Sequence, residues 1–529
     1  MKRYILTIAS ALMLMPASIF AQGFSSPLST EKKPWTAVPQ IKSDDYKFVV
    51  IPDKKGGDET GVFDVAIQEI NRLAPDFVIN IGDLIEGFVS DVSYTVPMWD
   101  DILGRLEKLD APFFLVGGNH DLSSEALTED FIKRFGATYY SFNVGPDLFL
   151  VLDSEEHGGR DISDTQVKYF ENILKGWNGR HIYVFMHSPN WYPTPHGGYE
   201  FIDKMLQGHQ YTVFTGHTHT YYMEERGGME YYVVATAGGD SELRGPEVGE
   251  FDHYMLVSAR DGKPAIANIP IGAMVPNDVV NKDNAGKVQW MLSNGYIQTP
   301  YLILNTAATQ HFSFDLTASN PMDSKMVYSF DFPEDLGLSF TPASGSGSLE
   351  PGEKKTFHID VTKTGGIEVG RIPFNTSCGF ELMNGFKSVP KVMSVFTDCV
   401  RTIEEDEQIV VDVHDPYKVS ESWDWSGVDD GWFEFSVSRG WNYIQVAVTT
   451  HDDIRASDKV YVTFESAGKR QEFEMEPEEA TVRIPLKEVK GGEFLLNVRF
   501  RDNDDVREAD PSVLWWRDPA HMGKFVLGR

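Results

Sequence analysis

Short apolar runs alternate with amphipathic stretches between Lys47 and Ile271. The apolar runs are continuous, as expected for strands buried on both faces: KFVVIPD, PDFVINIGD, PFFLVGGNHD, LFLVLDS, HIYVFMHSP and YTVFTGHTH. Between the first two runs, apolar residues recur at the spacing of one helical face: Phe63, Ala66, Ile67, Ile70 and Leu73. This alternation predicts a layered α/β fold, a β-sandwich flanked by helices.

A second helix is predicted before the HIYVFMHSP run. Ser163 and Gln166 have the spacing of a capping box, in which each side chain bonds the other residue's backbone. Val167, Phe170 and Leu174 follow on one face. This helix should cover the sheet that contains the neighbouring strands.

After about residue 300 the pattern changes to strict alternation of apolar and polar residues, interrupted by turn sequences such as SGSGS and EPGE. Alternation of this kind is typical of strands in β-sandwiches. We predict two further domains, an immunoglobulin-like β-sandwich over 281–400 and a second β-sandwich over 401–529. The α/β domain is assigned to 45–280, and residues 22–44 are a linker.

The first 21 residues have the pattern of a secretory signal. Lys2 and Arg3 precede an apolar run, and small residues lead to a cleavage point near Ala21. The alternative is an uncleaved anchor, for which the apolar run is short. No later stretch is long and apolar enough to predict a membrane span. We therefore expect a periplasmic or secreted protein.

The composition restricts the class of partner. Of 529 residues 41% are hydrophobic, enough for packed cores, and the formal net charge is −32. A field of this sign repels nucleic acid and anionic membranes, so we expect neither as a partner. An anionic substrate would need a local positive centre such as bound metal. Cys378 and Cys399 are the only cysteines, and either a disulfide or two free thiols is compatible with export.

Polar residues with metal-binding side chains gather at the ends of the predicted strands. Strand ends on one edge of an α/β sheet are where ligands bind. Carboxylate, amide and imidazole ligands without cysteine suit Zn, Mn or Fe, and an aspartate among imidazoles can bridge two such ions. The set is Asp53, Asp83, Asn119, His120, His187, His217 and His219.

Four short motifs occur in order at these strand ends: GDLIEG at 82–87, GNHD at 118–121, MHSP at 186–189 and GHTH at 216–219. Together they resemble the signature of calcineurin-like metallophosphoesterases. The resemblance covers roughly residues 45–275. It implies two divalent metals, a phosphoester substrate, and in-line attack by metal-bound hydroxide.

The resemblance also implies a role for each residue. Asp83 would bridge the metals, Asn119, His187 and His217 would complete one site, and Asp53 and His219 would belong to the other. His120 would act as the general acid and would be oriented by Asp121. These assignments form the expected metal and catalytic set.

The chain departs from the family at its first motif, which is usually Asp-x-His. Here the motif is Asp53-Lys54-Lys55, and a protonated lysine cannot coordinate a metal. Three protein ligands remain for that ion, which is sufficient for a catalytic metal, so we expect a weakened first site. Lys55 would either contact a substrate phosphate or point to solvent. Arg160 is a second candidate for substrate binding, and His157 is the first candidate for a replacement ligand.

Residues 427–464, with RDNDD at 501–505, resemble a family 9 carbohydrate-binding module. Trp423, Trp425, Trp432 and Trp441 would stack on sugars or fill the sandwich core. The leading hypothesis is an exported metallophosphoesterase that acts on a phosphate mono- or diester. If the last domain binds sugar, the substrate would be linked to a glycan. The alternative is a non-catalytic phosphate-ligand or glycan-binding protein that has lost one metal ligand at Lys55.

Overall fold

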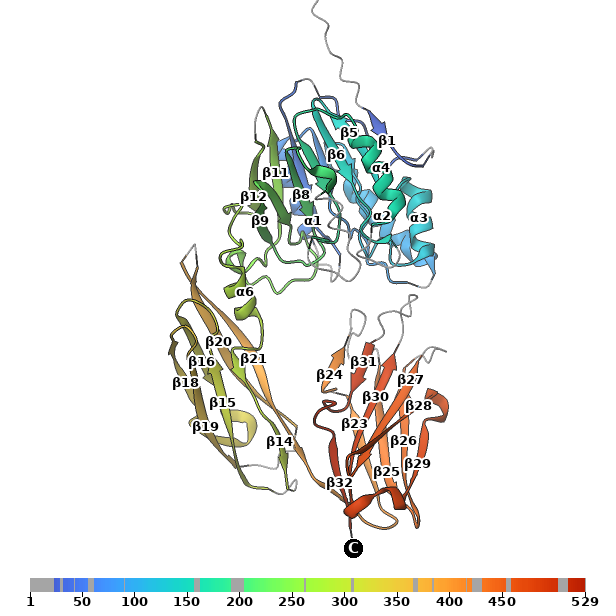
Figure 1. Cartoon of the computed structure of the whole chain (residues 1–529), viewed down its shortest axis with the longest axis vertical. Coiled ribbons are helices and arrows are strands. Elements are labelled where there is room, and N and C mark those ends of the chain that lie inside the picture. Colours follow the sequence, from blue (N-terminus) through green and yellow to red (C-terminus); the bar gives the residue numbers. More distant parts are fainter. Residues whose placement is uncertain are drawn as a thin grey trace, which may run out of the picture.

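The computed structural model describes residues 23–28, 32–41, 43–55, 61–89, 91–156, 162–191, 204–260, 263–305, 309–364, 370–382, 385–414, 416–420, 431–452, 458–502 and 512–528. The predicted signal lies outside these residues. Figure 1 shows an α/β part, which carries helices α1 to α4, followed by helix α6 and then by all-β sheets. The predicted fold class is therefore confirmed.

Two mixed sheets pack face to face in the α/β part. In the described residues the first has the order β1-β5-β6-β7-β8-β10-β9 and the second β12-β11-β2-β3-β4. The strands of the first are β1 (Phe24–Ser25), β5 (Tyr140–Val144), β6 (Asp147–Val151), β7 (Ile182–Phe185), β8 (Tyr211–Thr215), β9 (Tyr222–Arg226) and β10 (Met229–Val233). Those of the second are β2 (Tyr46–Ile51), β3 (Phe77–Asn80), β4 (Phe113–Phe114), β11 (His253–Ala259) and β12 (Ala265–Pro270).

Aromatic side chains fill the space between the two sheets. Phe48 and Phe77 stack with ring centroids 5.1 Å apart, and Phe149 meets Phe48 edge-on at 5.3 Å. Helices cover the outer faces: α1 (Val62–Leu73), α2 (Thr95–Leu106) and α3 (Glu125–Phe135) pack on the second sheet, and α4 (Asp164–Leu174) on the first. The four layers hold the strand ends rigidly.

The predicted start of α4 is correct in part. The Ser163 hydroxyl accepts the Gln166 backbone N–H at 3.2 Å. The Gln166 side chain does not return to Ser163, because it is buried against the Asp153 backbone N–H and carbonyl, at 2.8 and 2.9 Å. The Gln166 side chain is therefore used in tertiary packing and does not form a capping box.

Four all-β sheets follow in the part of the chain that the structure describes. The first pair has the orders β13-β15-β19-β17 and β14-β21-β20-β16-β18. Its strands are β13 (Ile297–Gln298), β14 (Tyr301–Leu304), β15 (His311–Ser319), β16 (Met326–Asp331), β17 (Leu338–Thr341), β18 (Ser344–Leu349), β19 (Lys354–Lys363), β20 (Arg371–Leu382) and β21 (Gly385–Cys399). Cys378 and Cys399 are free thiols.

The second pair has the orders β22-β32-β30-β27-β28, with β31 pairing β30 and β24, and β23-β25-β26-β29. Its strands are β22 (Arg401–Ile403), β23 (Gln408–Val413), β24 (Lys418–Ser420), β25 (Trp432–Arg439), β26 (Tyr443–His451), β27 (Lys459–Ser466), β28 (Lys469–Met475), β29 (Thr481–Pro485), β30 (Glu493–Asp502), β31 (Ser512–Trp515) and β32 (Gly523–Leu527).

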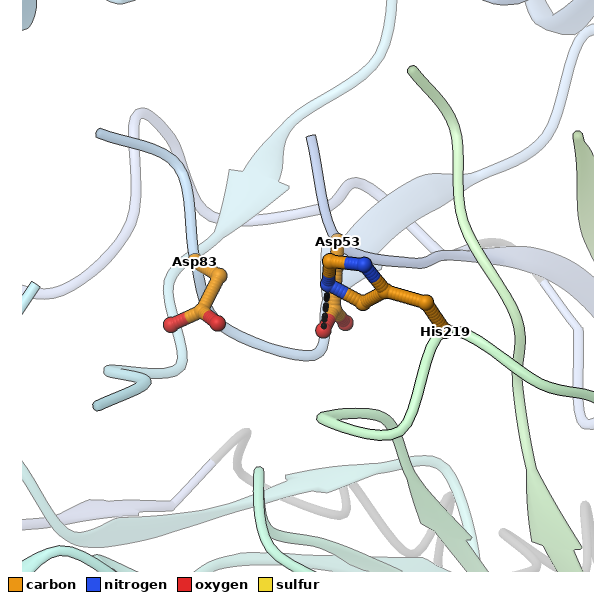
Figure 2. Close-up of side chains that lie close together, drawn as sticks. All are labelled: Asp53, Asp83 and His219. Atoms are coloured by element: carbon orange, nitrogen blue, oxygen red, sulfur yellow. Dashed lines mark ion pairs between the residues drawn. The ribbon is translucent and has the colours of Figure 1, made fainter. Parts of the chain in front are cut away.

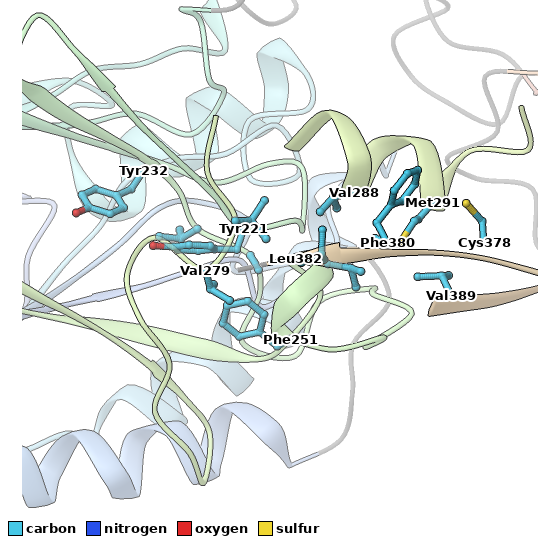
Figure 3. Packing of buried hydrophobic residues seen from close by; sticks show 14 of the residues in the cluster. Tyr221, Tyr232, Phe251, Val279, Val288, Met291, Cys378, Phe380, Leu382 and Val389 are labelled. Atoms are coloured by element: carbon cyan, nitrogen blue, oxygen red, sulfur yellow. The ribbon is translucent and has the colours of Figure 1, made fainter. Parts of the chain in front are cut away.

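Helix α6 (Ala285–Leu292) joins the α/β part to the first sandwich. Its buried residues Val288 and Met291 lie against Phe380, Leu382 and Val389 of β20 and β21 in one continuous core (Figure 3). The Lys387 ammonium also donates to the Arg244 carbonyl at 2.7 Å. No helix in the described residues has the length and apolarity needed to cross a bilayer.

Candidate metal centre

The predicted ligands come from the carboxyl ends of strands in both sheets. Asp53 follows β2, Asp83 follows β3, Asn119 follows β4, His187 follows β7, and His217 and His219 follow β8. The Ala237 N–H donates to the Asp53 carbonyl at 2.8 Å and the Gly216 N–H to the His187 carbonyl at 2.9 Å. These bonds fix the strand ends against one another, so residues distant in sequence meet at one place.

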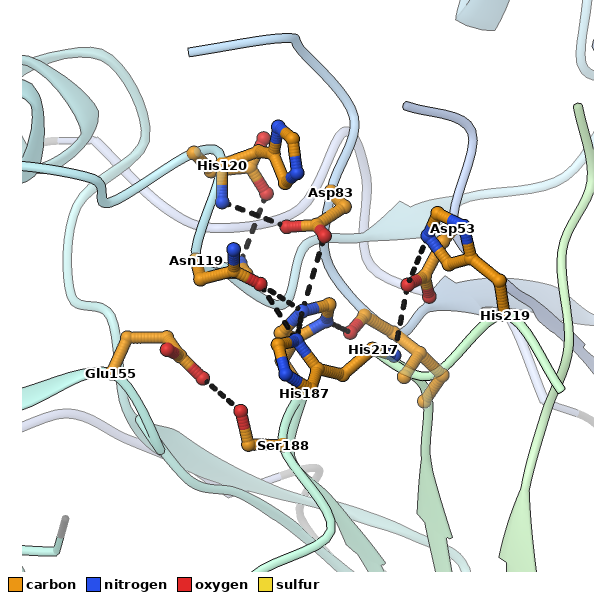
Figure 4. A network of polar contacts seen from close by, with 12 residues as sticks. Asp53, Asp83, Asn119, His120, Glu155, His187, Ser188, His217 and His219 are labelled. Atoms are coloured by element: carbon orange, nitrogen blue, oxygen red, sulfur yellow. Dashed lines mark hydrogen bonds and ion pairs between the residues drawn. The ribbon is translucent and has the colours of Figure 1, made fainter. Parts of the chain in front are cut away.

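One group of four side chains points to a common centre (Figure 4). The Asn119 Oδ1 atom lies 2.8 Å from both His187 Nε2 and His217 Nδ1. The Asp83 Oδ2 atom lies 3.2 Å from the same His187 Nε2, which is itself 3.2 Å from His217 Nδ1. Two oxygens that can only accept and two ring nitrogens thus converge.

A second group shares Asp83. Ligand atoms of Asp53, Asp83 and His219 all lie within 4.8 Å of one another, and His219 Nε2 is 3.4 Å from Asp53 Oδ2 (Figure 2). The other Asp53 oxygen, Oδ1, is buried without a hydrogen-bond partner. Leaving a buried carboxylate oxygen unpaired is costly, and a cation would satisfy it.

The histidine tautomers fit metal ligation. His187 Nδ1 donates to the Ile81 carbonyl at 2.8 Å, and His219 Nδ1 donates to the Asp240 carbonyl at 2.7 Å. Ligating histidines characteristically donate their second ring N–H to such an acceptor, which leaves the other nitrogen's lone pair for the ion. Both Nε2 lone pairs face carboxylates here, so the residues present fit a pair of divalent cations.

The carboxylates also set the electrostatics of the histidines. Burial alone would lower the pKa of His187, but Asp83 and Asp53 outweigh it and hold that pKa well above 6.5. Burial likewise opposes protonation of His219, yet contact with Asp53 raises its pKa to about 9. The site therefore attracts positive charge, although the two imidazoles must be neutral to bind metal.

Two glycines leave room for the carboxylates of Asp83 and Asp53. A Cβ atom at Gly118 would collide with Asp83 Oδ1, and one at Gly216 would collide with Asp53 Oδ1. Asp83 itself has a left-handed backbone with φ of 53°, which aspartate tolerates better than bulky residues. Glycine is therefore needed at these two motif positions, because any side chain there would displace a ligand carboxylate.

His120 lies beside this centre. Its backbone N–H donates to Asp83 Oδ1 at 3.0 Å, and its ring Nδ1 lies 2.6 Å from the Glu86 carbonyl oxygen. The ring is 7% exposed and meets Phe88 edge-on at 4.6 Å. Because Nδ1 donates to Glu86, the Nε2 edge is the one available for proton transfer.

The Asp121 carboxylate binds backbone groups, and its role in orienting His120 stays a prediction. The Asp121 carboxylate accepts the backbone N–H groups of Leu84, Ile85 and Gly118, at 3.0, 3.1 and 3.0 Å. It therefore ties the loop that carries Asp83 to the loop that carries Asn119. Burial and the nearby Asp83 raise the pKa of Asp121 to about 7. The Glu86 carbonyl, which no sequence pattern marks, holds the His120 ring.

The substrate-binding candidates are only partly described. Lys55 is half-buried, and its backbone N–H donates to the Asp83 carbonyl at 3.0 Å, as does that of Lys54. Lys54 is 1% exposed, which sequence analysis did not anticipate. Arg160 and His157 lie outside the described residues, so their predicted roles stay predictions.

A buried acidic group adjoins the centre. Glu155, which follows β6, accepts the hydroxyls of Ser154 and Ser188 at 2.8 and 2.7 Å (Figure 4). Ser188 is next to His187, and the charge of Glu155 helps to raise the pKa of that histidine. The DSEE sequence at the end of β6 occupies the same kind of strand end as the other motifs and offered a signal for this group.

The chain is similar in sequence to a known family and to several known proteins. Residues 55–221 match the family described as calcineurin-like phosphoesterase. This segment is a calcineurin-like metallophosphoesterase domain. Serine/threonine-protein phosphatase CPPED1 of Danio rerio is 32% identical over 145 residues, which cover 25% of this chain and 46% of the relative. The Homo sapiens protein of the same name is 28% identical over 194 residues, 31% of this chain and 62% of the relative.

The chain thus spans about half to two thirds of the length of these relatives. Two solved structures are also similar in part. A dimetal phosphatase from Danio rerio matches 43% of this chain and 96% of its own, with 12% identity and a TM-score of 0.35. The 5'-nucleotidase from Candida albicans matches 44% of this chain and 52% of its own, with 13% identity and a TM-score of 0.31.

Proposed function

We propose that this protein is an exported, metal-dependent phosphoesterase that hydrolyses a phosphate mono- or diester. The observation that carries the proposal is the sharing of Asp83 between two groups of ligand atoms. Asn119, His187 and His217 would hold one divalent ion with Asp83, and Asp53 and His219 would hold the other. Bound ions of this kind neutralise phosphoryl oxygens and activate a water molecule for attack.

Residues of the chain would handle the leaving group. His120 Nδ1 is committed to the Glu86 carbonyl at 2.6 Å, so His120 would donate the proton that it carries at Nε2 to the departing alkoxide oxygen. A positioned general acid of this type accelerates such reactions by about 10²–10⁴-fold. Burial of the ring against Phe88 keeps its orientation fixed.

Export rests on the sequence of residues 1–21. Strand β1 begins at Phe24 and pairs antiparallel with β5, and the Ser25 carbonyl accepts the Tyr169 hydroxyl at 2.5 Å. Cleavage near Ala21 would therefore leave the first described strand intact. The glycan-linked substrate and the carbohydrate-binding role of residues 401–529 stay predictions.

The function is tested on the protein purified from the exported fraction, whose intact mass should correspond to cleavage near Ala21. We expect about two divalent ions per chain by elemental analysis. We also expect hydrolysis of p-nitrophenyl phosphate or bis(p-nitrophenyl) phosphate, lost on chelation and restored by Zn, Mn or Fe. Bound metal without hydrolysis of either ester would favour the non-catalytic binding protein.

Replacing Lys55 by histidine tests the weakened first site. The backbone of residue 55 is fixed to the Asp83 carbonyl, so an imidazole there starts beside the metal centre and should add a fourth protein ligand. We expect Mn²⁺ to bind the weaker site about tenfold more tightly, measured by isothermal titration calorimetry. Lys55→Gln is the matched control, because it removes the charge without adding a ligand. Equal affinities in the two variants would mean that residue 55 faces away from the ion.

A further inference from the structure

A cavity of about 550 Å³ lies between the two β-sandwiches, remote from the metal ligands. Its lining comes from the end of the first sandwich, the connecting strand β22, and the second sandwich. The residues that matter below are Arg371, Phe396, Arg401, Tyr417 and Arg517, together with the run 409–414. A volume of this size is within the range of protein binding sites, about 300–1,000 Å³.

One wall of the cavity is the edge of strand β23. In the described residues β23 pairs with β25 and has no strand on its other side. The six consecutive residues 409–414 all line the cavity. Side chains of a strand alternate between its two faces. Six consecutive residues can therefore line the same cavity only if the edge of the strand, and not one of its faces, is directed toward that cavity. The unpaired N–H and C=O groups of an edge strand can accept a further strand.

The opposite wall carries an excess of positive charge. Arg401 and Arg517 both bind the Asp398 carboxylate, at 2.8 and 3.1 Å. Two guanidinium groups against one carboxylate leave one positive charge over. Arg371 is the third arginine of this wall, and it is held by the carbonyls of Pro416 and Tyr417 and lies 4.8 Å above the Phe396 ring. Asp412 on the β23 wall offsets one further charge, so the three arginines exceed Asp398 and Asp412 by one. In a chain with a net charge of −32, this positive balance favours an acidic ligand.

Contacts between the sandwiches hold the two walls in place. The Asp398–Arg517 pair joins β21 to the end of β31, and the Phe396 and Tyr417 rings meet at 4.5 Å. Tyr301 of β14 stacks on His521 at 4.6 Å. The site is thus formed before any ligand binds, which lowers the entropic cost of binding.

Phe396 and Trp516 of the lining do not offer open ring faces to a sugar. Phe396 is covered by Arg371 and Tyr417. Trp516 is 2% exposed and lies between Arg401 and Arg517, at 5.2 and 4.6 Å. Sugar recognition depends largely on stacking against exposed aromatic faces, whereas strand addition needs only a free backbone edge and side-chain pockets.

We propose that this cavity binds an extended acidic peptide segment. The segment adds as a strand to the free edge of β23 and directs its carboxylates toward Arg371, Arg401 and Arg517. Backbone hydrogen bonds to the edge supply affinity and the arginines supply selectivity for acidic sequences. This site is separate from the proposed phosphoesterase centre and does not depend on bound metal.

The test uses fluorescence anisotropy of the full chain with a fluorescein-labelled octapeptide of alternating glutamate and valine. Two further peptides carry N-methyl groups on every glutamate amide or on every valine amide. An added strand uses every second amide toward its neighbour, so one methylated peptide should bind at least about tenfold more weakly than the other. An alternating lysine–valine peptide should not bind.

A protein variant checks the charge contribution. Arg371→Gln should weaken binding of the parent peptide by about fivefold or more. Arg483→Gln is the matched control, because Arg483 lies on β29, the opposite edge strand of the same sheet. Its guanidinium lies 4.9 Å above the Tyr443 ring and donates to the Gln445 side chain. Hydrolysis of p-nitrophenyl phosphate should be the same in both variants.

Equal binding of the two N-methylated peptides would overturn the proposal, because a ligand held by charge alone does not distinguish them. Binding of oligogalacturonate in preference to the peptide would identify an acidic sugar site instead and would equally overturn it. The peptide comparison uses the unaltered protein, so it decides the question even if Arg371→Gln disturbs the junction. Its outcome is independent of whether the metal centre is catalytic.

Discussion

Replacing Asp83 by asparagine should abolish hydrolysis and reduce the bound divalent metal to at most one ion per chain. Asp83 is the carboxylate that both ligand groups share, through Oδ2 toward His187 and through its place beside Asp53 and His219. An uncharged amide can offer one oxygen but cannot balance two cations. We expect turnover to fall by at least about 10³-fold, measured with p-nitrophenyl esters alongside elemental analysis.

Asparagine is the informative substitution because it preserves the local structure. It tolerates the left-handed backbone of position 83, where φ is 53°, and it can still accept the His120 N–H. The matched control is Asp240→Asn, an exposed residue that meets the site only through its backbone carbonyl. A folded Asp83→Asn protein that keeps two ions would contradict the shared-ligand arrangement, and a control that loses them would point to a general effect of charge.

The candidate metal ligands could be proposed from the sequence because they stand at the ends of buried strands. Once short apolar runs are assigned to strands, a site is expected at the carboxyl ends of these strands; the structure has β2, β3 and β4 in one sheet and β7 and β8 in the other. The ligands Asp53, Asp83, Asn119, His187 and His217 therefore follow from chain order and strand direction. The fold class follows from the same periodicity, and so does the change to all-β structure after residue 300.

The supporting groups could not be predicted in the same way. The Ile81, Glu86 and Asp240 carbonyls fix three histidine rings, but every residue has a carbonyl and no side-chain pattern marks these. The family resemblance assigned Asp121 to the orientation of His120. The Asp121 carboxylate satisfies three backbone N–H groups, since burial makes unpaired donors costly.

The contacts between domains also cannot be predicted from the local pattern of apolar and polar residues. Alternation in β23 predicts a strand but not which of its edges has no neighbouring strand in the described residues. The arginines that line the adjoining cavity come from positions 371, 401 and 517, which lie far apart in the sequence. Only the packing of the two sandwiches brings these residues together, so the proposed peptide site depends on tertiary structure throughout.

Replacing His120 by asparagine should separate proton transfer from metal binding. The His120 ring contacts the Glu86 carbonyl and Phe88, and it reaches the ligand set only through its backbone N–H to Asp83. Asparagine keeps that backbone bond, so metal content should not change. Turnover should fall by about 10²–10⁴-fold for esters with alkyl leaving groups, whose alkoxides need a proton.

The size of the effect should depend on the leaving group. A p-nitrophenolate departs without protonation, so His120→Asn should slow p-nitrophenyl ester hydrolysis far less than alkyl ester hydrolysis, as measured by kcat for each ester. His358→Asn on β19 is the matched control, because that histidine is exposed and pairs with Asp315. An equal loss for both leaving groups would exclude His120 as the proton donor and would assign it to substrate positioning, since a positioning residue affects both esters alike.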